Sequence, residues 1–245
     1  MDSRDLPKLN RREAIEALGG FAGMMALTIG CGDSVSSPTS PSSSTTTTTS
    51  SSTCAVTPSE TEGPYPDKTG MVNNSANYRR DVTEGKPGLP LTLVLTVVNA
   101  NSGCSAVANA NVEIWHCDAA GNYSEYSQPG FDGTGQTFLR GVQTTDSSGQ
   151  VTFTTIYPGW YAGRATHIHV DVFVNRALVK TTQVAFPEST TAAVYSTGVY
   201  ASKGQNPTSI ASDNVFSDGT QSEMATMTGS TSSGYTASLT IGIAV

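Results

Sequence analysis

Apolar and polar residues alternate along much of the chain beyond residue 90. In LTLVLTVVNA at 91–100, Leu91, Leu93 and Leu95 fall on one face of an extended chain, and Thr92, Val94 and Thr96 fall on the other. Successive side chains of a strand point to opposite faces, so this pattern predicts a half-buried strand. Similar stretches predict further strands at 111–117, 150–156, 166–174, 179–186 and 235–245.

The segments between these strands are rich in Asn, Gly, Ser and Asp, and DSSGQ at 146–150 is typical of a hairpin turn. No long helical periodicity is present. We expect irregular loops at 187–234, where the pattern is least legible. Several short strands with turn residues between them predict an all-β fold, a sandwich or a barrel.

The first thirty residues have the pattern of an export signal. Arg11 and Arg12 precede a weakly apolar stretch at 17–29, which is too short and too rich in glycine for a transmembrane helix. This arrangement resembles the signal of the twin-arginine export route, which carries folded proteins. An amphipathic N-terminal helix is the alternative interpretation. We therefore assign residues 1–30 to a twin-arginine-type signal segment.

Cys31 ends this apolar stretch, and Gly30 directly before it resembles the cleavage box of bacterial lipoproteins, in which the cysteine is lipidated. Thr28 stands where Leu is more usual. Residues 34–52 are rich in Ser and Thr and bury too little apolar surface to offset chain entropy. We expect 31–52 to be a lipidated cysteine and a disordered tether. The protein would then be exported and held at a membrane, with one folded domain at 53–245.

Charge and cysteines add two further expectations. The chain carries a net charge of −7, and apart from Arg79 and Arg80 the basic residues of the domain are scattered singly. Nucleic acid is therefore not expected as a partner. Cys104 and Cys117 flank a short loop that leads into a strand, and in an oxidising compartment we predict a disulfide between them. Cys54 is then left without an assigned partner.

Two of the three histidines, His167 and His169, lie two residues apart in a predicted strand. Both imidazoles then point to the same face and can bind one metal ion, while Ile168 packs behind them. Imidazole suits iron, copper, zinc and nickel, so the pair does not name the metal. An isolated pair of this kind in a β protein more often has no metal role.

Two tyrosines in turn or loop segments next to predicted strands are further candidate ligands. Tyr161 precedes His167 by six residues, and Tyr123 follows the strand predicted at 111–117. A phenol ionises near pH ~10, but a hard trivalent cation can stabilise the phenolate at neutral pH. Two phenolates and two imidazoles would neutralise most of the charge of iron(III).

Five motifs follow one another in a fixed order over most of the domain. They are EGPYP (62–66), NVEIWHCDAAGNYS (111–124), FLRGVQTTDSSGQVTFTTIYPGWY (138–161), GRATHIH (163–169) and TTQVAF (181–186). In this order they resemble the intradiol ring-cleavage dioxygenases, the relatives of protocatechuate 3,4-dioxygenase and catechol 1,2-dioxygenase. The resemblance implies a β-sandwich that holds one non-haem iron(III).

Specific roles follow from the positions of residues within these motifs. The resemblance implies four iron ligands: Tyr123, Tyr161, His167 and His169. Arg164 matches the family's active-site arginine, and Gln183 matches a glutamine beside the substrate. The implied reaction cleaves a catechol-type ring with O2 between the two hydroxyl-bearing carbons and gives a muconate-type diacid. Tyr161 would leave the metal when substrate binds and take up a substrate proton.

Four other aromatic or imidazole groups stand near these motifs. His116 is not at a ligand position, and we expect it to be a hydrogen-bonded histidine at a strand end. Tyr126 and Tyr157 are rival ligands that are out of register with the motif. Tyr65 is expected to line the pocket. The helical dimerisation segment of the catechol dioxygenases has no counterpart before EGPYP, so the sequence predicts no oligomeric state.

Two other interpretations remain open. The first is an exported, non-catalytic β-sandwich binding module that retains the metal site. The second is a zinc or copper site on the same fold, although two tyrosines are poor ligands for a soft or borderline metal. Colour distinguishes these, because charge transfer between iron(III) and phenolate makes a protein burgundy.

Overall fold

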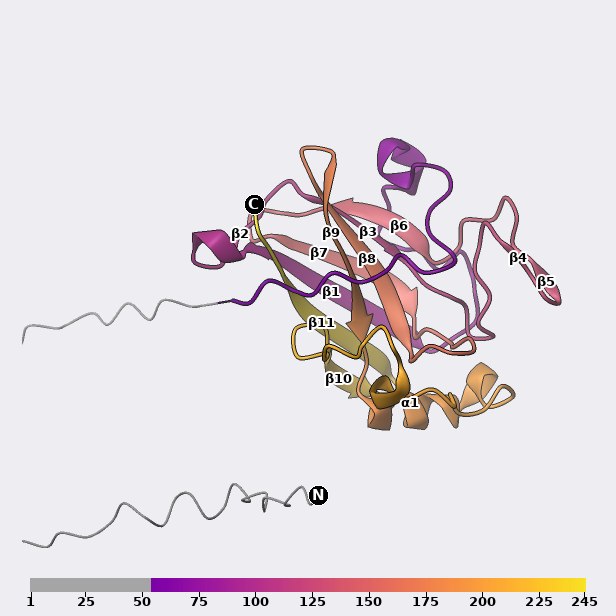
Figure 1. Ribbon diagram of the computed structural model, residues 1–245. Coiled ribbons are helices and arrows are strands. Elements are labelled where there is room, and N and C mark those ends of the chain that lie inside the picture. The colour runs from indigo at the N-terminus through magenta and orange to yellow at the C-terminus, as the bar shows by residue number, and fades with distance from the viewer. Residues whose placement is uncertain (1–53) are drawn as a thin grey trace, which may run out of the picture. The chain divides into compact units, whose positions relative to one another are not determined.

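Two β-sheets form the body of the protein in the computed structural model, which describes residues 54–245 (Figure 1). The first sheet contains β1 (Pro90–Asn99), β2 (Ser105–Ala106), β7 (Gln150–Ile156), β10 (Thr226–Ser230) and β11 (Gly234–Ile243). The second contains β3 (Asn111–Trp115), β6 (Arg140–Thr144), β8 (His167–Val174) and β9 (Ala177–Ala185). A separate hairpin pairs β4 (Ser127–Gln128) with β5 (Phe131–Asp132). The signal segment, Cys31 and the tether expected at 1–52 lie outside the described residues.

Helices are short throughout the described part of the chain. They are α1 (Glu188–Tyr195) and the 3-10 helices η1 (Met71–Asn73), η2 (Ser75–Asn77), η3 (Ala100–Ser102), η4 (Gly198–Tyr200) and η5 (Ile210–Ser212). Between residues 54 and 245, no helix has the length and apolar character needed to cross a bilayer.

The core lies between the two sheets. Leu93 and Phe153 from the first sheet belong to the same buried cluster as Ile114, Val170 and Val184 from the second. The sheets therefore pack face to face, which confirms the prediction of an all-β fold and makes it a β-sandwich. All six strands predicted from the sequence are present, with ends that differ by only a few residues.

The alternation of side chains along β8 determines on which face of the second sheet the two histidines lie. Ile168, Val170 and Val172 point into the core between the sheets. Because strand side chains alternate, His167, His169 and their neighbours at the same spacing must point to the outer face of the second sheet. Burial of one face thus fixes the direction of the imidazoles on the other.

The turn at 146–150 forms, but the hairpin predicted there is wrong. Asp146 Oδ1 accepts hydrogen bonds from the backbone N–H groups of Ser148 and Gln150, which closes a tight turn. The strands on either side belong to different sheets, since β6 pairs with β3 and β7 pairs with β1. The turn therefore carries the chain from one sheet to the other. Residues 146–150 determine that the chain reverses, but they do not determine which strands pair.

The expectation of irregular loops at 187–234 is wrong in part. Helix α1 begins after Pro187 and buries Thr191, Val194 and Tyr195, and β10 pairs antiparallel with β11. The helix mixes small polar and apolar residues over only eight positions, and β10 is a polar, mostly exposed strand. Neither segment has the hydrophobic periodicity from which a helix or a strand can be predicted.

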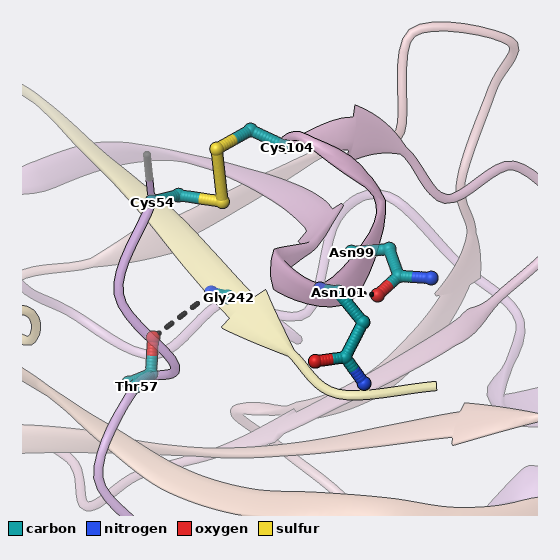
Figure 2. The surroundings of a disulfide bond; sticks show 6 residues. All are labelled: Cys54, Thr57, Asn99, Asn101, Cys104 and Gly242. Atoms are coloured by element: carbon teal, nitrogen blue, oxygen red, sulfur yellow. Dashed lines mark hydrogen bonds between the residues drawn. A yellow bond between two sulfur atoms is a disulfide. The ribbon is translucent and has the colours of Figure 1, made fainter. Parts of the chain in front are cut away.

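The predicted disulfide between Cys104 and Cys117 is wrong, because Cys104 is bonded to Cys54 (Figure 2). The backbone of Thr57 is hydrogen-bonded to Gly242 on β11, which runs parallel to β1, and Cys104 lies just beyond the end of β1. The Cα atoms of Cys54 and Cys104 are consequently 5.6 Å apart, despite 50 positions of sequence separation. Cys117 is a buried free thiol instead.

Candidate active site

The structure brings Tyr123, Tyr161, His167 and His169 together, and we call these four residues the tyrosine–histidine cluster. The two Nε2 atoms of the histidines are 3.0 Å apart, and the Tyr161 hydroxyl is 3.3 Å from Nε2 of His167. The ring of Tyr123 lies 5.7 Å from that of Tyr161 and 6.4 Å from that of His169. Four polar groups from three segments therefore converge on the outer face of the second sheet.

The tautomer of His167 follows from its neighbours. Its Nδ1 atom lies 2.6 Å from the carbonyl oxygen of Ala165, which can only accept a hydrogen bond. Nδ1 must therefore carry the proton, which leaves the lone pair of a neutral ring on Nε2, facing His169 and Tyr161. A ring fixed in this way is suited to bind a metal through Nε2.

Burial keeps all four groups uncharged when no cation is bound. It lowers the pKa of His167 to about 3, an effect to which the charge of Arg164 adds, and lowers the pKa of His169 well below its usual value. Burial also raises the pKa of Tyr161 to about 12 and that of Tyr123 well above its usual range. Neutral imidazoles are ready to bind a metal, whereas the phenols need a nearby cation in order to ionise.

The Tyr123 hydroxyl shows that the cluster is incomplete by itself. It is buried and has no hydrogen-bond partner in the described part of the chain. Leaving such a hydroxyl unsatisfied costs about 1–3 kcal/mol, and a metal ion would supply the missing partner. Within 54–245, no three His, Cys, Asp or Glu side chains are grouped as metal ligands, so a metal here depends on the tyrosines. Two hard phenol oxygens and two imidazole nitrogens fit iron(III).

Two residues from the recognised motifs shape the space around His169. Trp115, its cross-strand neighbour on β3, stacks on the imidazole with ring centres 4.7 Å apart and an angle of 3° between the planes. Gly63 lies close to the same imidazole, and an added Cβ there would lie 3.1 Å from Cε1 of His169 and 3.8 Å from the Tyr161 hydroxyl. Its φ of +69° also favours glycine. Neither residue was assigned a role from the sequence.

Arg164 is held beside the cluster by two side chains. Its Nε donates to both carboxylate oxygens of Asp213, at 3.1 and 2.9 Å, and one Nη donates to Oε1 of Gln183. The amide of Gln183 donates in turn to the carbonyl of Thr61 at 2.9 Å. The second Nη of Arg164 is buried without a partner. The guanidinium is thus fixed in position and retains a free donor.

Asp213 is the partner that sequence reasoning missed. Its Oδ2 also accepts a hydrogen bond from the backbone N–H of Ala165 at 2.7 Å, so one carboxylate fixes both the side chain and the loop of Arg164. The residue lies 49 positions beyond Arg164, in the stretch where no pattern was found. No spacing or motif in the sequence could have indicated it.

The other candidates near the motifs have their own partners. His116 is bonded to the Cys117 carbonyl at 2.9 Å and to the Thr155 hydroxyl at 2.7 Å, as expected for a hydrogen-bonded histidine at a strand end. The rival tyrosines bond elsewhere, Tyr126 to Pro66 and Tyr157 to Thr191. Tyr65 stacks on Tyr123 at 4.6 Å between ring centres, so it packs against the cluster.

Comparison with known proteins agrees with this geometry. A family model described as "Dioxygenase" matches residues 61–226. The chain is also 28% identical to an intradiol ring-cleavage dioxygenase from Tetranychus urticae, with a TM-score of 0.70, and the match covers 78% of this chain and 95% of that one. The chain belongs to the intradiol ring-cleavage dioxygenases. The dioxygenase is therefore an oxidoreductase that cleaves aromatic rings.

Other solved structures share the fold of this dioxygenase. The dioxygenase domain of a dioxygenase and carbohydrate-binding protein fusion from Streptomyces sp. SirexAA-E is 25% identical, with a TM-score of 0.55, and the match covers 78% of this chain and 99% of that one. A 3-chlorocatechol 1,2-dioxygenase from Rhodococcus opacus 1CP is 20% identical, with a TM-score of 0.51, and the corresponding shares are 77% and 72%. No curated protein sequence matches the chain.

Proposed function

We propose that this dioxygenase binds iron(III) through Tyr123, Tyr161, His167 and His169. We also propose that it cleaves a catechol-type ring between the two hydroxyl-bearing carbons. The reaction takes up one O2 and gives a muconate-type diacid, so that both oxygen atoms are retained in the product. The observation that carries the proposal is the tyrosine–histidine cluster, in which two Nε2 atoms lie 3.0 Å apart beside the buried phenol of Tyr123 and the partly buried phenol of Tyr161.

Tyr161 is the group suited to take the substrate's proton. When bound, iron(III) supplies the Lewis acidity and the electron-accepting capacity that make a catechol reactive toward O2. A phenol whose pKa is raised to about 12 by burial is a strong base once it is deprotonated. Tyr161 can therefore hold a proton from a substrate hydroxyl at its own oxygen.

Arg164 is suited to stabilise negative charge as it develops on the substrate. Its buried, unpartnered Nη is a free donor beside the cluster. Asp213 and Gln183 hold the guanidinium in place, so no reorganisation is needed when the charge forms. Trp115 and Gly63 pack against His169, and Tyr65 packs against Tyr123, so these residues line the cluster itself.

Metal content and colour test the ligand set. We expect about one iron(III) per chain and a visible absorption band that weakens in Tyr161→Phe and shifts in Tyr123→Phe. Tyr157→Phe is the matched control, because the buried Tyr157 hydroxyl bonds to Thr191 outside the cluster, and its band should match that of the parent. A colourless protein fully loaded with zinc from iron-replete cells would overturn the assignment.

Product analysis tests the position of cleavage. With catechol or a substituted catechol and labelled O2, a colourless diacid carrying the label is expected. Arg164→Ala should lower kcat far more than it raises KM, since its donor acts on charge that forms during the reaction. A yellow semialdehyde would place the cut beside the hydroxyl-bearing carbons, and iron-loaded protein that turns over no catechol would refute the substrate class.

We further propose that the mature protein is exported and held at a membrane through a lipidated Cys31. The twin arginine at 11–12 and the LTIGC string support this, and so does the disulfide at Cys54, since such bonds persist in oxidising compartments. Changing Arg11 and Arg12 to Lys should retain the protein in the cytoplasm, whereas Cys31→Ser should release exported protein from the membrane fraction. Parent protein found only in the cytoplasm would refute the proposal.

A further inference from the structure

A cavity of about 210 Å³ lies between the 62–72 segment and the outer face of the second sheet. It is separate from the tyrosine–histidine cluster, none of whose residues lines it. Four carboxylates do line it, from Glu62, Asp67, Glu113 and Asp171, and no Lys or Arg does. We call it the carboxylate cavity.

Glu113 and Asp171 set this cavity apart from an ordinary acidic surface. They are direct partners in the register of β3 with β8, and their exposed fractions are only 2% and 6%. Like charges placed opposite each other on neighbouring strands are destabilising, and burial makes each charge more costly. Oδ1 of Asp171 is moreover buried without a hydrogen-bond partner. No Lys or Arg in the lining of the cavity faces these two carboxylates.

The other charged groups nearby offset the charge of this pair only in part. Asp67 uses both of its oxygens to accept hydrogen bonds from Thr69 and Met71 in its own turn, so it adds only negative charge. The guanidinium of Arg140 donates to Ser124 and to the Tyr65 carbonyl and pairs with Glu125 at 3.6 Å. Burial and then the charges of Asp67 and Asp171 raise the pKa of Glu113 to about 8, and the charge of Arg140 opposes this only in part. The charged form of Glu113 is therefore disfavoured unless a positive group lies beside it.

The lining indicates an organic cation. Within residues 54–245, no three carboxylate, imidazole or thiol groups are placed to hold a metal ion, and a hard metal ion such as Ca²⁺ takes six or more oxygen ligands. A primary ammonium has three N–H donors and needs only a few acceptors. The other walls include Val72, Phe173 and Leu178, which are apolar and suit a carbon chain attached to the nitrogen.

We propose that the carboxylate cavity binds a primary alkylammonium group, which donates hydrogen bonds to Glu113 and Asp171. Asp171 follows His169 by two positions on the same face of β8, which places the two side chains about 7 Å apart. The ammonium can therefore be the side arm of a catechol or belong to a separate amine. The assignment of the ammonium to a catechol rests on the proposed function, whereas the binding of an ammonium in the cavity does not.

Calorimetric titration of the iron-loaded full chain with butylammonium chloride tests the cavity. Glu113→Gln and Asp171→Asn should each weaken binding about tenfold or more, because a charge-assisted hydrogen bond is lost. Butanol should not bind detectably, since it lacks the charge. Asp218→Asn removes an exposed carboxylate outside the cavity and should bind butylammonium as the parent does.

Thermal melting without amine checks folding, and Glu113→Gln should melt no lower than the parent, because one of two opposed carboxylates is gone. No binding of butylammonium to the parent, or equal affinity in the parent and a folded Glu113→Gln, would overturn the proposal.

Steady-state kinetics with two matched catechols then identifies the source of the ammonium. If it is the substrate's side arm, 4-(2-aminoethyl)catechol should have a KM about tenfold below that of 4-ethylcatechol, and Glu113→Gln should remove the difference. Equal KM values, together with butylammonium binding that depends on Glu113, assign the cavity to a separate amine. Absence of turnover would refute the ring-cleavage proposal and leave the titration result unchanged.

Discussion

Arg164 illustrates how one functional side chain is set by residues from distant parts of the chain. Both carboxylate oxygens of Asp213 accept hydrogen bonds from Nε of Arg164, and the side-chain oxygen of Gln183 on β9 accepts one from Nη. An arginine without these contacts would have many rotamers, most of which would not present the free Nη to the substrate. The proposed catalytic effect of Arg164 therefore depends on a positioning residue that does not touch the substrate.

Replacing that positioning residue gives the prediction at this scale. Asp213→Asn keeps the size of the side chain but removes its charge, so the hold on Arg164 weakens while Arg164 itself remains. We expect kcat to fall about tenfold to a hundredfold with a much smaller change in KM, as the loss of a charge-assisted hydrogen bond implies. Steady-state kinetics checks this, with the exposed Asp218→Asn as control. Unchanged kcat in a folded, iron-loaded Asp213→Asn would show that Arg164 needs no such support.

At the scale of elements, the N-terminal segment of the domain is tied to strands from both sheets. Thr57 bonds to Gly242 on β11, and Glu60 donates from its backbone to the Thr181 carbonyl on β9. Lys180 adds a hydrogen bond from its Nζ to the Thr57 carbonyl at 2.7 Å. The disulfide between Cys54 and Cys104 fixes the start of this segment (Figure 2). The segment leads directly to Thr61 and Gly63, which contact the active site.

Removal of the disulfide should destabilise the whole domain. The chain-entropy model gives about 4 kcal/mol for a bridge with this sequence separation, so Cys104→Ser should lower the free energy of unfolding by up to that amount. Denaturant unfolding measures the change, and the double variant with Cys54→Ser should be no less stable than the single one. Digestion without reduction should yield joined peptides that carry Cys54 and Cys104. A peptide pair joining Cys104 to Cys117 would contradict the structure.

Across the whole molecule, buried ionisable groups give stability a distinctive pH dependence. Burial raises the pKa of Glu113 to about 8 and that of Glu223 to about 7. The stability from these groups is present at low pH and is lost as pH rises through those values. Burial lowers the pKa of His116 to about 4 and that of His167 to about 3. The stability from these two histidines is lost only as pH falls below about 6.5, the pKa of histidine in the unfolded chain. Above pH ~6.5, of these four groups only Glu113 and Glu223 therefore change the stability with pH.

The metal-free protein should accordingly lose stability between pH ~6.5 and ~8, with a slope of up to about 1.4 kcal/mol per pH unit for each proton involved. Chemical unfolding at several pH values, in buffer without amines, measures this. Glu113→Gln should flatten the curve at the alkaline end. A stability that rises over this range would show that Glu113 is ionised in the folded protein.

The sequence by itself determined what depends on local pattern. Alternation in β1 and β8 located strands and gave the face on which His167 and His169 lie, because one side of each strand must be buried. Motif order along 62–186 predicted the sandwich and the residues of the tyrosine–histidine cluster, and the structure brings those residues together. Their roles as ligands remain predictions that metal analysis can test.

Only the tertiary structure decided the features that depend on which strands become neighbours. The partner of Cys104 is set by the parallel pairing of β1 with β11, and the partner of Arg164 by a loop 49 residues further along the chain. The facing of Glu113 and Asp171 follows from the register of β3 with β8. Long-range contacts of this kind form because the whole core is buried together, and no local window of sequence contains that information.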